Sequence, residues 1–109
     1  MAFKYNAALL KKMEEIFTKV DVLATPTLPV TAPRIDANLD QELSFADPIG
    51  GIGNICGLPA ASVPCGFGQH GLPIGIQFIG RGLDDAQVIQ AARLYQRQTD
   101  WHRKRPQLS

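Results

Sequence analysis

The stretch 60-AASVPCGFGQHGLPIGIQFI-79 determines the fold that this sequence predicts, because two apolar segments flank a glycine-rich connection. The first segment, residues 60–64, ends in a proline, which is typical of a strand end, a bulge or an edge strand. In the second segment, residues 72–79, large apolar side chains alternate with other residues, as in a strand: Ile74, Ile76 and Phe78. The connection between the segments is short enough for a hairpin.

A helix is predicted on the N-terminal side of this stretch, over residues 6–20. Its apolar side chains recur at helical spacing on one face, and charged side chains fill the other face. Asn6 is expected to be its N-cap. The apolar run at residues 22–25 follows this helix and predicts a buried strand that Pro26 ends.

A second long helix is predicted on the C-terminal side, over residues 84–98. Asp84 is expected to cap it, with Gln87 at the third helical position as in a capping box. Leu83 and Val88 have the spacing of a hydrophobic staple around that cap.

Residues 48–57, PIGGIGNICG, predict a third and shorter helix, because Pro48 suits a first helical turn and Gly57 suits a helix end. Each internal glycine destabilises such a helix by about 1 kcal/mol relative to alanine. A helix that keeps three of them is expected to need close approach of another element or a ligand to its backbone.

The chain has 109 residues, the size of one domain at most, and its elements predict the α/β class with about three strands and three helices. Eleven basic and ten acidic residues give a net charge of +1, so no nucleic-acid partner is expected. The one basic cluster, residues 102–105 beside Trp101, is expected to be a solvated tail.

No apolar run approaches the roughly 20 residues of a membrane span, and no signal-peptide pattern is present, so we expect a cytoplasmic protein without membrane contact. The two cysteines, Cys56 and Cys65, have neither metal-binding nor redox spacing. They are expected to be reduced and buried thiols, as in a cytosolic protein.

The residues of the chain predict no active site and no cofactor. None of its three serines, at positions 44, 62 and 109, stands in a Gly-x-Ser-x-Gly elbow. Ser62 is expected to be a hydrogen-bonded serine inside a buried strand. The two cysteines and the two histidines, His70 and His102, lack a spacing that favours a Cys-His pair, and two distant histidines do not predict a metal site.

Four runs of sequence, in order, resemble motifs of the amidase signature family. They are 22-VLATPT-27, 54-NICGLPAASVPCGF-67, 71-GLPIGIQFIGR-81 and 99-TDWHR-103. The resemblance covers about residues 16–107 and implies the C-terminal part of a large mixed-sheet α/β hydrolase. In this view residues 1–109 are a single partial domain, the C-terminal segment of an amidase-signature domain.

The same resemblance implies amide-bond cleavage in the parent enzyme, by a Ser nucleophile, a relay Ser in a cis peptide and a Lys base. No position of this sequence matches those three groups, so no catalytic residue is assigned and the chain alone is expected to be catalytically incompetent. One wall of the acyl side of the substrate pocket is expected from the glycine-rich helix, at Ile49, Gly51, Ile52, Asn54 and Ile55.

The family includes small-amide hydrolases and the A subunit of the tRNA-dependent amidotransferase. Residues 44–48, SFADP, look less like the amidotransferase version and favour a general amidase. The expected partner is the missing N-terminal catalytic portion. The alternative function is a stand-alone, non-enzymatic module that self-associates or binds a partner chain. A monomer with so few strands and helices is expected to leave a large apolar face uncovered.

Overall fold

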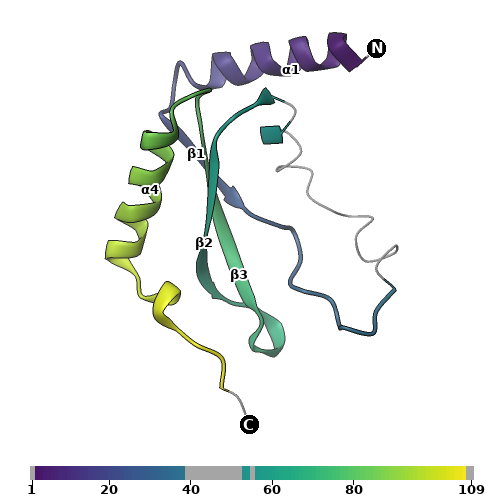
Figure 1. The fold of residues 1–109 in the computed structure, drawn as a ribbon, viewed down its shortest axis with the longest axis vertical. Coiled ribbons are helices and arrows are strands. Elements are labelled where there is room, and N and C mark those ends of the chain that lie inside the picture. The colour runs from purple at the N-terminus through teal and green to yellow at the C-terminus, as the bar shows by residue number, and fades with distance from the viewer. Residues whose placement is uncertain (1, 39–52, 55, 108–109) are drawn as a thin grey trace.

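The computed structural model describes residues 2–38, 53–54 and 56–107. The predicted α/β class is confirmed: three strands form one antiparallel sheet in the order β1-β3-β2, with long helices packed against it (Figure 1). The elements in chain order are α1 (Ala2–Ile16), β1 (Val22–Pro26), β2 (Ala60–Phe67), the 3-10 turn η2 (Gln69–Gly71), β3 (Pro73–Gly80), α4 (Asp85–Gln98) and the 3-10 turn η3 (Trp101–Arg103).

The predicted hairpin is confirmed, since β2 and β3 pair antiparallel through the short turn η2. Of the three alternatives predicted at Pro64, the bulge and the edge strand are confirmed, and the strand end was wrong. β2 continues to Phe67 through a shift in register between Pro64 and Gly66, where Gly66 adopts a φ of 150°. Few residues other than glycine adopt that conformation, so Gly66 lets the strand bend and resume its pairing.

Each of the two edge strands of the sheet contains a proline, Pro26 in β1 and Pro64 in β2. The amide of Thr27 donates to the carbonyl of Gly75, and the amide of Gly80 donates to the carbonyl of Pro59. Because hydrogen-bonding groups alternate along a strand, these two bonds place Pro26 and Pro64 at positions whose backbone nitrogens point away from β3. A missing N–H at such a position costs no hydrogen bond within the sheet.

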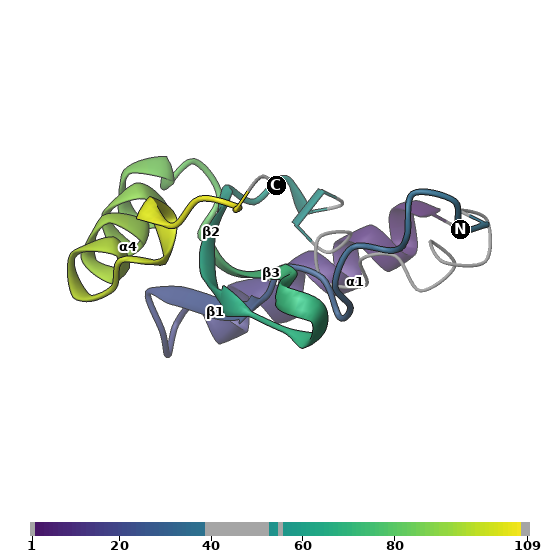
Figure 2. The same ribbon diagram turned by 90° about the horizontal axis from the view of Figure 1, so that it is seen from below.

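The two long helices lie on opposite faces of the sheet (Figure 2). On one face, Val88 and Ala92 of α4 are buried against Phe78. On the other face, Met13 and Phe17 are buried against Ile79. Since neighbouring residues of a strand point to opposite faces, the central strand β3 supplies the centre of both apolar clusters.

The boundaries of α1 differ from the prediction, because the helix begins at Ala2 and ends at Ile16. Asn6 is therefore an interior residue and the predicted N-cap was wrong. Beyond Ile16 the chain leaves the helix, and Arg81 donates hydrogen bonds to backbone carbonyls of the segment that follows. Its guanidinium donates to the carbonyl of Phe17, at 3.2 Å from Nε, and to the carbonyl of Val20, at 3.3 Å.

The predicted cap of α4 is correct in position and wrong in chemistry. Asp84 is the N-cap residue, but its side chain makes no capping hydrogen bond. Leu83 has a φ of 67° and is 99% exposed, so it forms no staple with Val88. The left-handed conformation of Leu83 turns its side chain toward solvent, while the amide of Asp84 donates to the carbonyl of Arg81 at 3.0 Å.

Three expectations of burial were wrong. β1 is a half-buried edge strand, because only β3 pairs with it among the described residues. Ser62 is exposed. Cys56 and Cys65 are free thiols, as predicted, but they are half-buried and not buried.

The third predicted helix is described only at residues 53–54 and 56, which are helical.

Candidate functional site

One face of the sheet carries a row of hydroxyl and amide side chains, and we call it the hydroxyl face. The register aligns Thr25 with Gln77 and Gln77 with Ser62, so these three residues of three strands share one level. They lie on the face opposite α4, since Phe78, which packs on α4, is the neighbour of Gln77. Gln77 is only 6% exposed, and its Nε2 donates to Oγ1 of Thr25 at 3.2 Å.

A close pair of hydroxyl groups joins this level, through Ser62, to the next one, where Thr27 lies beside Gly75. Oγ1 of Thr27 lies 2.6 Å from Oγ of Ser62, which is hydrogen-bonding distance. The bond spans from the residue after β1 to β2 and passes over Gly75 of the central strand. A Cβ atom at Gly75 would lie 2.9 Å from the Thr27 oxygen and 3.0 Å from the Ser62 oxygen. Only glycine leaves room for this bond without a shift of its neighbours.

A groove of about 360 Å³ adjoins this hydroxyl pair. Ser62 and Thr27 form its polar part, and the segment that follows β1 forms much of its apolar wall. Within that wall Leu28 is 51% exposed and Val30 is 55% exposed. The apolar lining residues are Leu28, Val30, Ala32, Val63, Pro64, Pro73 and Ile74. A groove of this kind fits an apolar group that ends in, or carries, a hydrogen-bonding function.

The end of the glycine-rich helix lies on the same face of the sheet. The amide of Leu58 donates to the carbonyl of Gly53 at 2.9 Å, and the amide of Gly57 donates to the carbonyl of Asn54 at 3.4 Å. Cys56 and Leu58 pack against the cluster around Ile79. Asn54 itself is exposed to solvent, and it is the one residue of the expected pocket wall that the structure describes.

The other expected residues of the pocket wall, Ile49, Gly51, Ile52 and Ile55, lie outside the described residues. Their role in a substrate pocket therefore stays a prediction. The packing of Cys56 and Leu58 against Met13, Phe17 and Ile79 places only the C-terminal end of the glycine-rich segment on the sheet.

The chemistry of the hydroxyl face is that of binding. In the described part of the chain, neither hydroxyl of the Thr27–Ser62 pair is hydrogen-bonded to a histidine, a lysine or a carboxylate. A serine without a neighbouring base has no group to take its proton, so these contacts do not activate Ser62 as a nucleophile. Among the described residues, no three His, Cys, Asp or Glu side chains are placed to hold a metal ion.

Thr25, Thr27, Gly75 and Gln77 were not predicted as site residues from the sequence. A weak signal was present, because Gly75 and Gln77 occupy the positions that interrupt the apolar alternation of their strand. Their partners come from elsewhere in the chain, and Thr27 stands 35 residues before Ser62. Only the register of the three strands brings them together.

In the described part of the chain, no helix has both the length and the hydropathy of a membrane span. Residues 1–89 match the protein family described as Amidase. The sequence is similar to the A subunit of the glutamyl-tRNA(Gln) amidotransferase of Picosynechococcus sp., with 43% identity over 109 residues that cover 98% of this chain and 22% of that protein.

Two solved structures have similar folds. The A subunit of the glutamyl-tRNA(Gln) amidotransferase of Thermotoga maritima matches with a TM-score of 0.75 and 35% identity, over 89% of this chain and 22% of that chain. A bacterial aryl acylamidase of the amidase signature family matches with a TM-score of 0.68 and 26% identity, over 94% and 24%. The higher identity to the amidotransferase protein does not support the general amidase that residues 44–48 favoured.

The chain spans less than a quarter of the length of each of these proteins. The family match nevertheless covers most of the chain, and the sheet with its two helices has the fold of the matching structures. The chain therefore belongs to the amidase signature family.

Proposed function

We propose that this chain is the C-terminal structural segment of an amidase-type hydrolase and that it does not cleave amide bonds alone. One observation carries the proposal: the hydroxyl pair of Thr27 and Ser62 on the sheet has no base hydrogen-bonded to it among the described residues. The share of the relatives that the chain spans, 22% of the Picosynechococcus protein, supports the same conclusion. Its contribution to the parent enzyme is a rigid sheet with one bound helix on each face.

The proposal includes one wall of the parent's substrate pocket, at Ile49, Gly51, Ile52, Asn54 and Ile55. It is supported by the exposed position of Asn54 and by the packing of the following residues on the hydroxyl face. The parent is proposed to be of the amidotransferase A-subunit type, because the relatives with 41–43% identity are of that type. A cytoplasmic location is also proposed, since Cys56 and Cys65 are free thiols.

The experiment measures ammonia release from glutamine and from small amides by the purified chain, with and without a second polypeptide. The second polypeptide is the remaining part of the Picosynechococcus protein, expressed separately. We expect no turnover by the chain alone and turnover by the mixture. Turnover by the chain alone that disappears in the Ser62→Ala variant would overturn the proposal.

The alternative function, a stand-alone module that associates with itself, is favoured by the exposed apolar wall of the groove at Leu28 and Val30. Light scattering during gel filtration measures the molar mass of the chain over a range of concentrations. The double variant Leu28→Ser, Val30→Ser tests the groove, and Ile35→Ser is its matched control because Ile35 is exposed outside the groove. A dimer that both the wild type and the control form, and that the double variant loses, would favour this alternative. A monomer at every concentration would exclude it.

A further inference from the structure

The charge of this chain is strongly divided along its length. Residues 93–105 carry five basic and one acidic side chain, a net charge of +4. The other 96 residues carry six basic and nine acidic side chains, a net charge of −3. The overall value of +1 therefore conceals a local basic surface, and a surface of this kind attracts polyanions.

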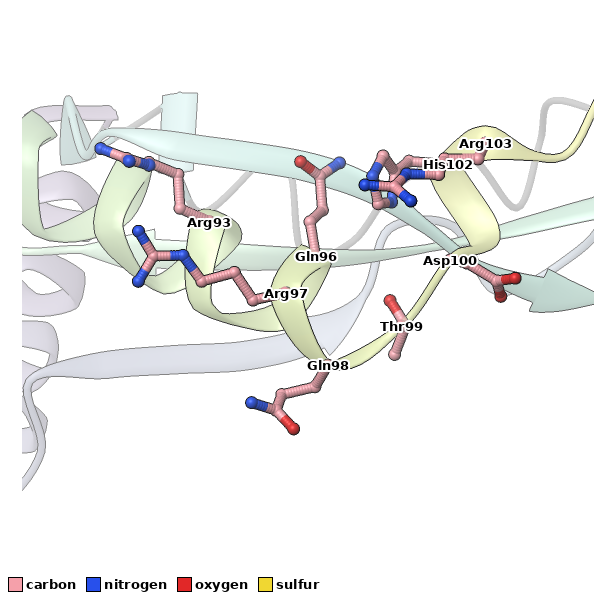
Figure 3. A pocket seen from close by; sticks show the side chains of 8 residues that line it. All are labelled: Arg93, Gln96, Arg97, Gln98, Thr99, Asp100, His102 and Arg103. Atoms are coloured by element: carbon pink, nitrogen blue, oxygen red, sulfur yellow. The ribbon is translucent and has the colours of Figure 1, made fainter.

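The structure gathers this charge around one open pocket, which we call the basic pocket. It has a volume of about 680 Å³ and lies where α4 ends and η3 begins (Figure 3). Its lining includes Arg93, Gln96, Arg97, Asp100, His102 and Arg103. Guanidinium groups and carboxamides are among the side chains that donate hydrogen bonds to phosphate oxygens.

Three arginines of the basic pocket are unneutralised. In the described part of the chain, no carboxylate pairs with Arg93, Arg97 or Arg103. The acidic residue of the pocket, Asp100, is engaged by Lys104, with 3.6 Å between Oδ2 and Nζ. The helix dipole favours a positive charge in the last turn of α4, which accounts for Arg97. It does not account for Arg103, which follows the helix.

The C-terminal side of the basic pocket is held in place by an aromatic contact. The ring of Trp101 meets the ring of Phe67 edge to face, with 6.0 Å between centroids and 78° between planes. This contact fixes η3 against β2 and so positions His102 and Arg103. The Nδ1 atom of His102 is buried and has no hydrogen-bond partner among the described residues, so a ligand can reach this ring only through Nε2.

The arrangement of the arginines fits a chain of phosphates better than a single phosphate. Arg93 and Arg97 are one turn apart on α4, and their guanidinium groups extend in the same direction (Figure 3). His102 and Arg103 lie beyond Gln96, at the other end of the pocket (Figure 3). Cationic groups that are spread along a surface can contact successive phosphates of one strand.

We propose that the basic pocket binds the phosphodiester backbone of a single-stranded nucleic acid. Arg93 and Arg97 bind phosphates at one end of the pocket, and Arg103 binds a phosphate at the other end. The polar lining favours a nucleic acid over a lipid surface, which requires apolar side chains beside the basic ones. Nucleic-acid binding here is independent of the proposed role as an amidase segment, and it departs from two sequence expectations, the solvated basic tail and the absence of a nucleic-acid partner.

The test titrates the full chain into a fluorescent oligonucleotide about 12 nucleotides long, as RNA and as DNA of the same sequence, at several salt concentrations. Each phosphate contact to a single strand contributes about −0.7 to the slope of log K against log salt, so three contacts give a slope of about −2. RNA and DNA are expected to bind within a few-fold of each other, because backbone contacts do not require the 2′-hydroxyl. Trp101 is the one tryptophan of the sequence and reports binding independently through its fluorescence.

Two variants with equal loss of charge complete the experiment. Arg93→Gln, Arg97→Gln, Arg103→Gln is expected to weaken binding at least about tenfold and to reduce the slope by about 2. The control Lys11→Gln, Lys12→Gln, Lys19→Gln removes three positive charges near α1 and is expected to change the slope little. Equal slopes in the two variants would overturn the proposal. So would no binding of either oligonucleotide, or binding only to vesicles that contain phosphatidylserine. Circular dichroism of both variants establishes that they fold.

Discussion

The hydroxyl oxygens of Thr27 and Ser62 lie 2.6 Å apart across Gly75, and their bond joins the two outer parts of the sheet over its central strand. A sheet of three strands normally connects its outer strands only through the strand between them. Here a side-chain bond adds a direct link, and it requires a residue without a Cβ atom beneath it. Thr27, Ser62 and Gly75 belong to three separate sequence motifs, residues 22–27, 54–67 and 71–81, and the sheet brings these motifs together at one point.

Gly75→Ala is expected to lower the free energy of unfolding by about 1–3 kcal/mol, because the new methyl group would lie within 3.0 Å of both hydroxyl oxygens. Urea denaturation followed by circular dichroism measures the loss. A matched control is Gly82→Ala, since no atom beyond Gly82 and its two chain neighbours lies within 4 Å of a Cβ at that position. Equal stability of the two variants would contradict the tight fit at Gly75.

The same arrangement predicts coupling between Gly75 and the hydroxyl pair. Thr27→Ala, Ser62→Ala removes both oxygens and is expected to cost about 0.5–1.5 kcal/mol, because the bond lies at an exposed position. Gly75→Ala introduced into that variant should cost less than it costs in the wild type. A double-mutant cycle from the four urea curves gives the interaction energy. A value of zero would show that the methyl group and the hydroxyls do not compete for space.

Arg81→Met is expected to destabilise the chain by about 1–2 kcal/mol and to loosen the end of α1. The guanidinium donates hydrogen bonds to the carbonyls of Phe17 and Val20 and lies 3.6 Å from a carboxylate oxygen of Asp21. Hydrogen bonds of a charged group contribute about 1.5–3 kcal/mol, and the 44% exposure of the Arg81 side chain reduces this value. Hydrogen exchange of the amides of Lys19 and Val20 should accelerate. Arg34→Met, which removes an exposed ion pair with Asp36, should leave both quantities unchanged.

Ile79→Ala is expected to cost about 2–5 kcal/mol, because Ile79 is 1% exposed and packs against Met13 and Phe17. The loss of the side chain leaves a cavity between β3 and α1, which the rigid sheet closes only in part. The denaturation midpoint in urea measures the change. Ile35→Ala provides the control for the loss of the same atoms, since Ile35 is fully exposed, and a similar cost in both variants would contradict the packing of α1.

Burial raises the pKa of the Cys56 thiol. Since the thiolate is the reactive form, we expect Cys56 to react with iodoacetamide more slowly at about pH 8 than a free cysteine peptide does. Because the pKa of Cys56 is raised in the fold, the neutral thiol stabilises the folded state, fully at pH values below the unfolded pKa of about 8.5. This stabilisation is lost as the pH rises through the higher pKa of the folded state. Mass spectrometry of the Cys65→Ala variant measures the rate at Cys56 alone. A rate equal to that of the peptide would contradict the burial of this thiol.

Much of the secondary structure follows from periodicity, and two of the errors concern helix starts, which periodicity does not determine. Alternating apolar residues predicted β3 correctly because every second side chain faces a packed helix. The expected cap at Asn6 was wrong because α1 begins four residues earlier. The expected staple at Leu83 was wrong because a left-handed turn, which depends on the backbone around Asp84, points its side chain to solvent.

The sequence by itself determined the family, the three strands and the long helices, because motif order and hydrophobic periodicity are local properties of the chain. It also predicted that no nucleophile stands in a recognised elbow. Only the tertiary structure decided the hydroxyl face and the basic pocket. The first depends on strand register, which brings together Thr27 and Ser62 from 35 residues apart, and the second depends on the contact between Trp101 and Phe67. Both are set by packing between segments that are distant in sequence, which composition and periodicity do not encode.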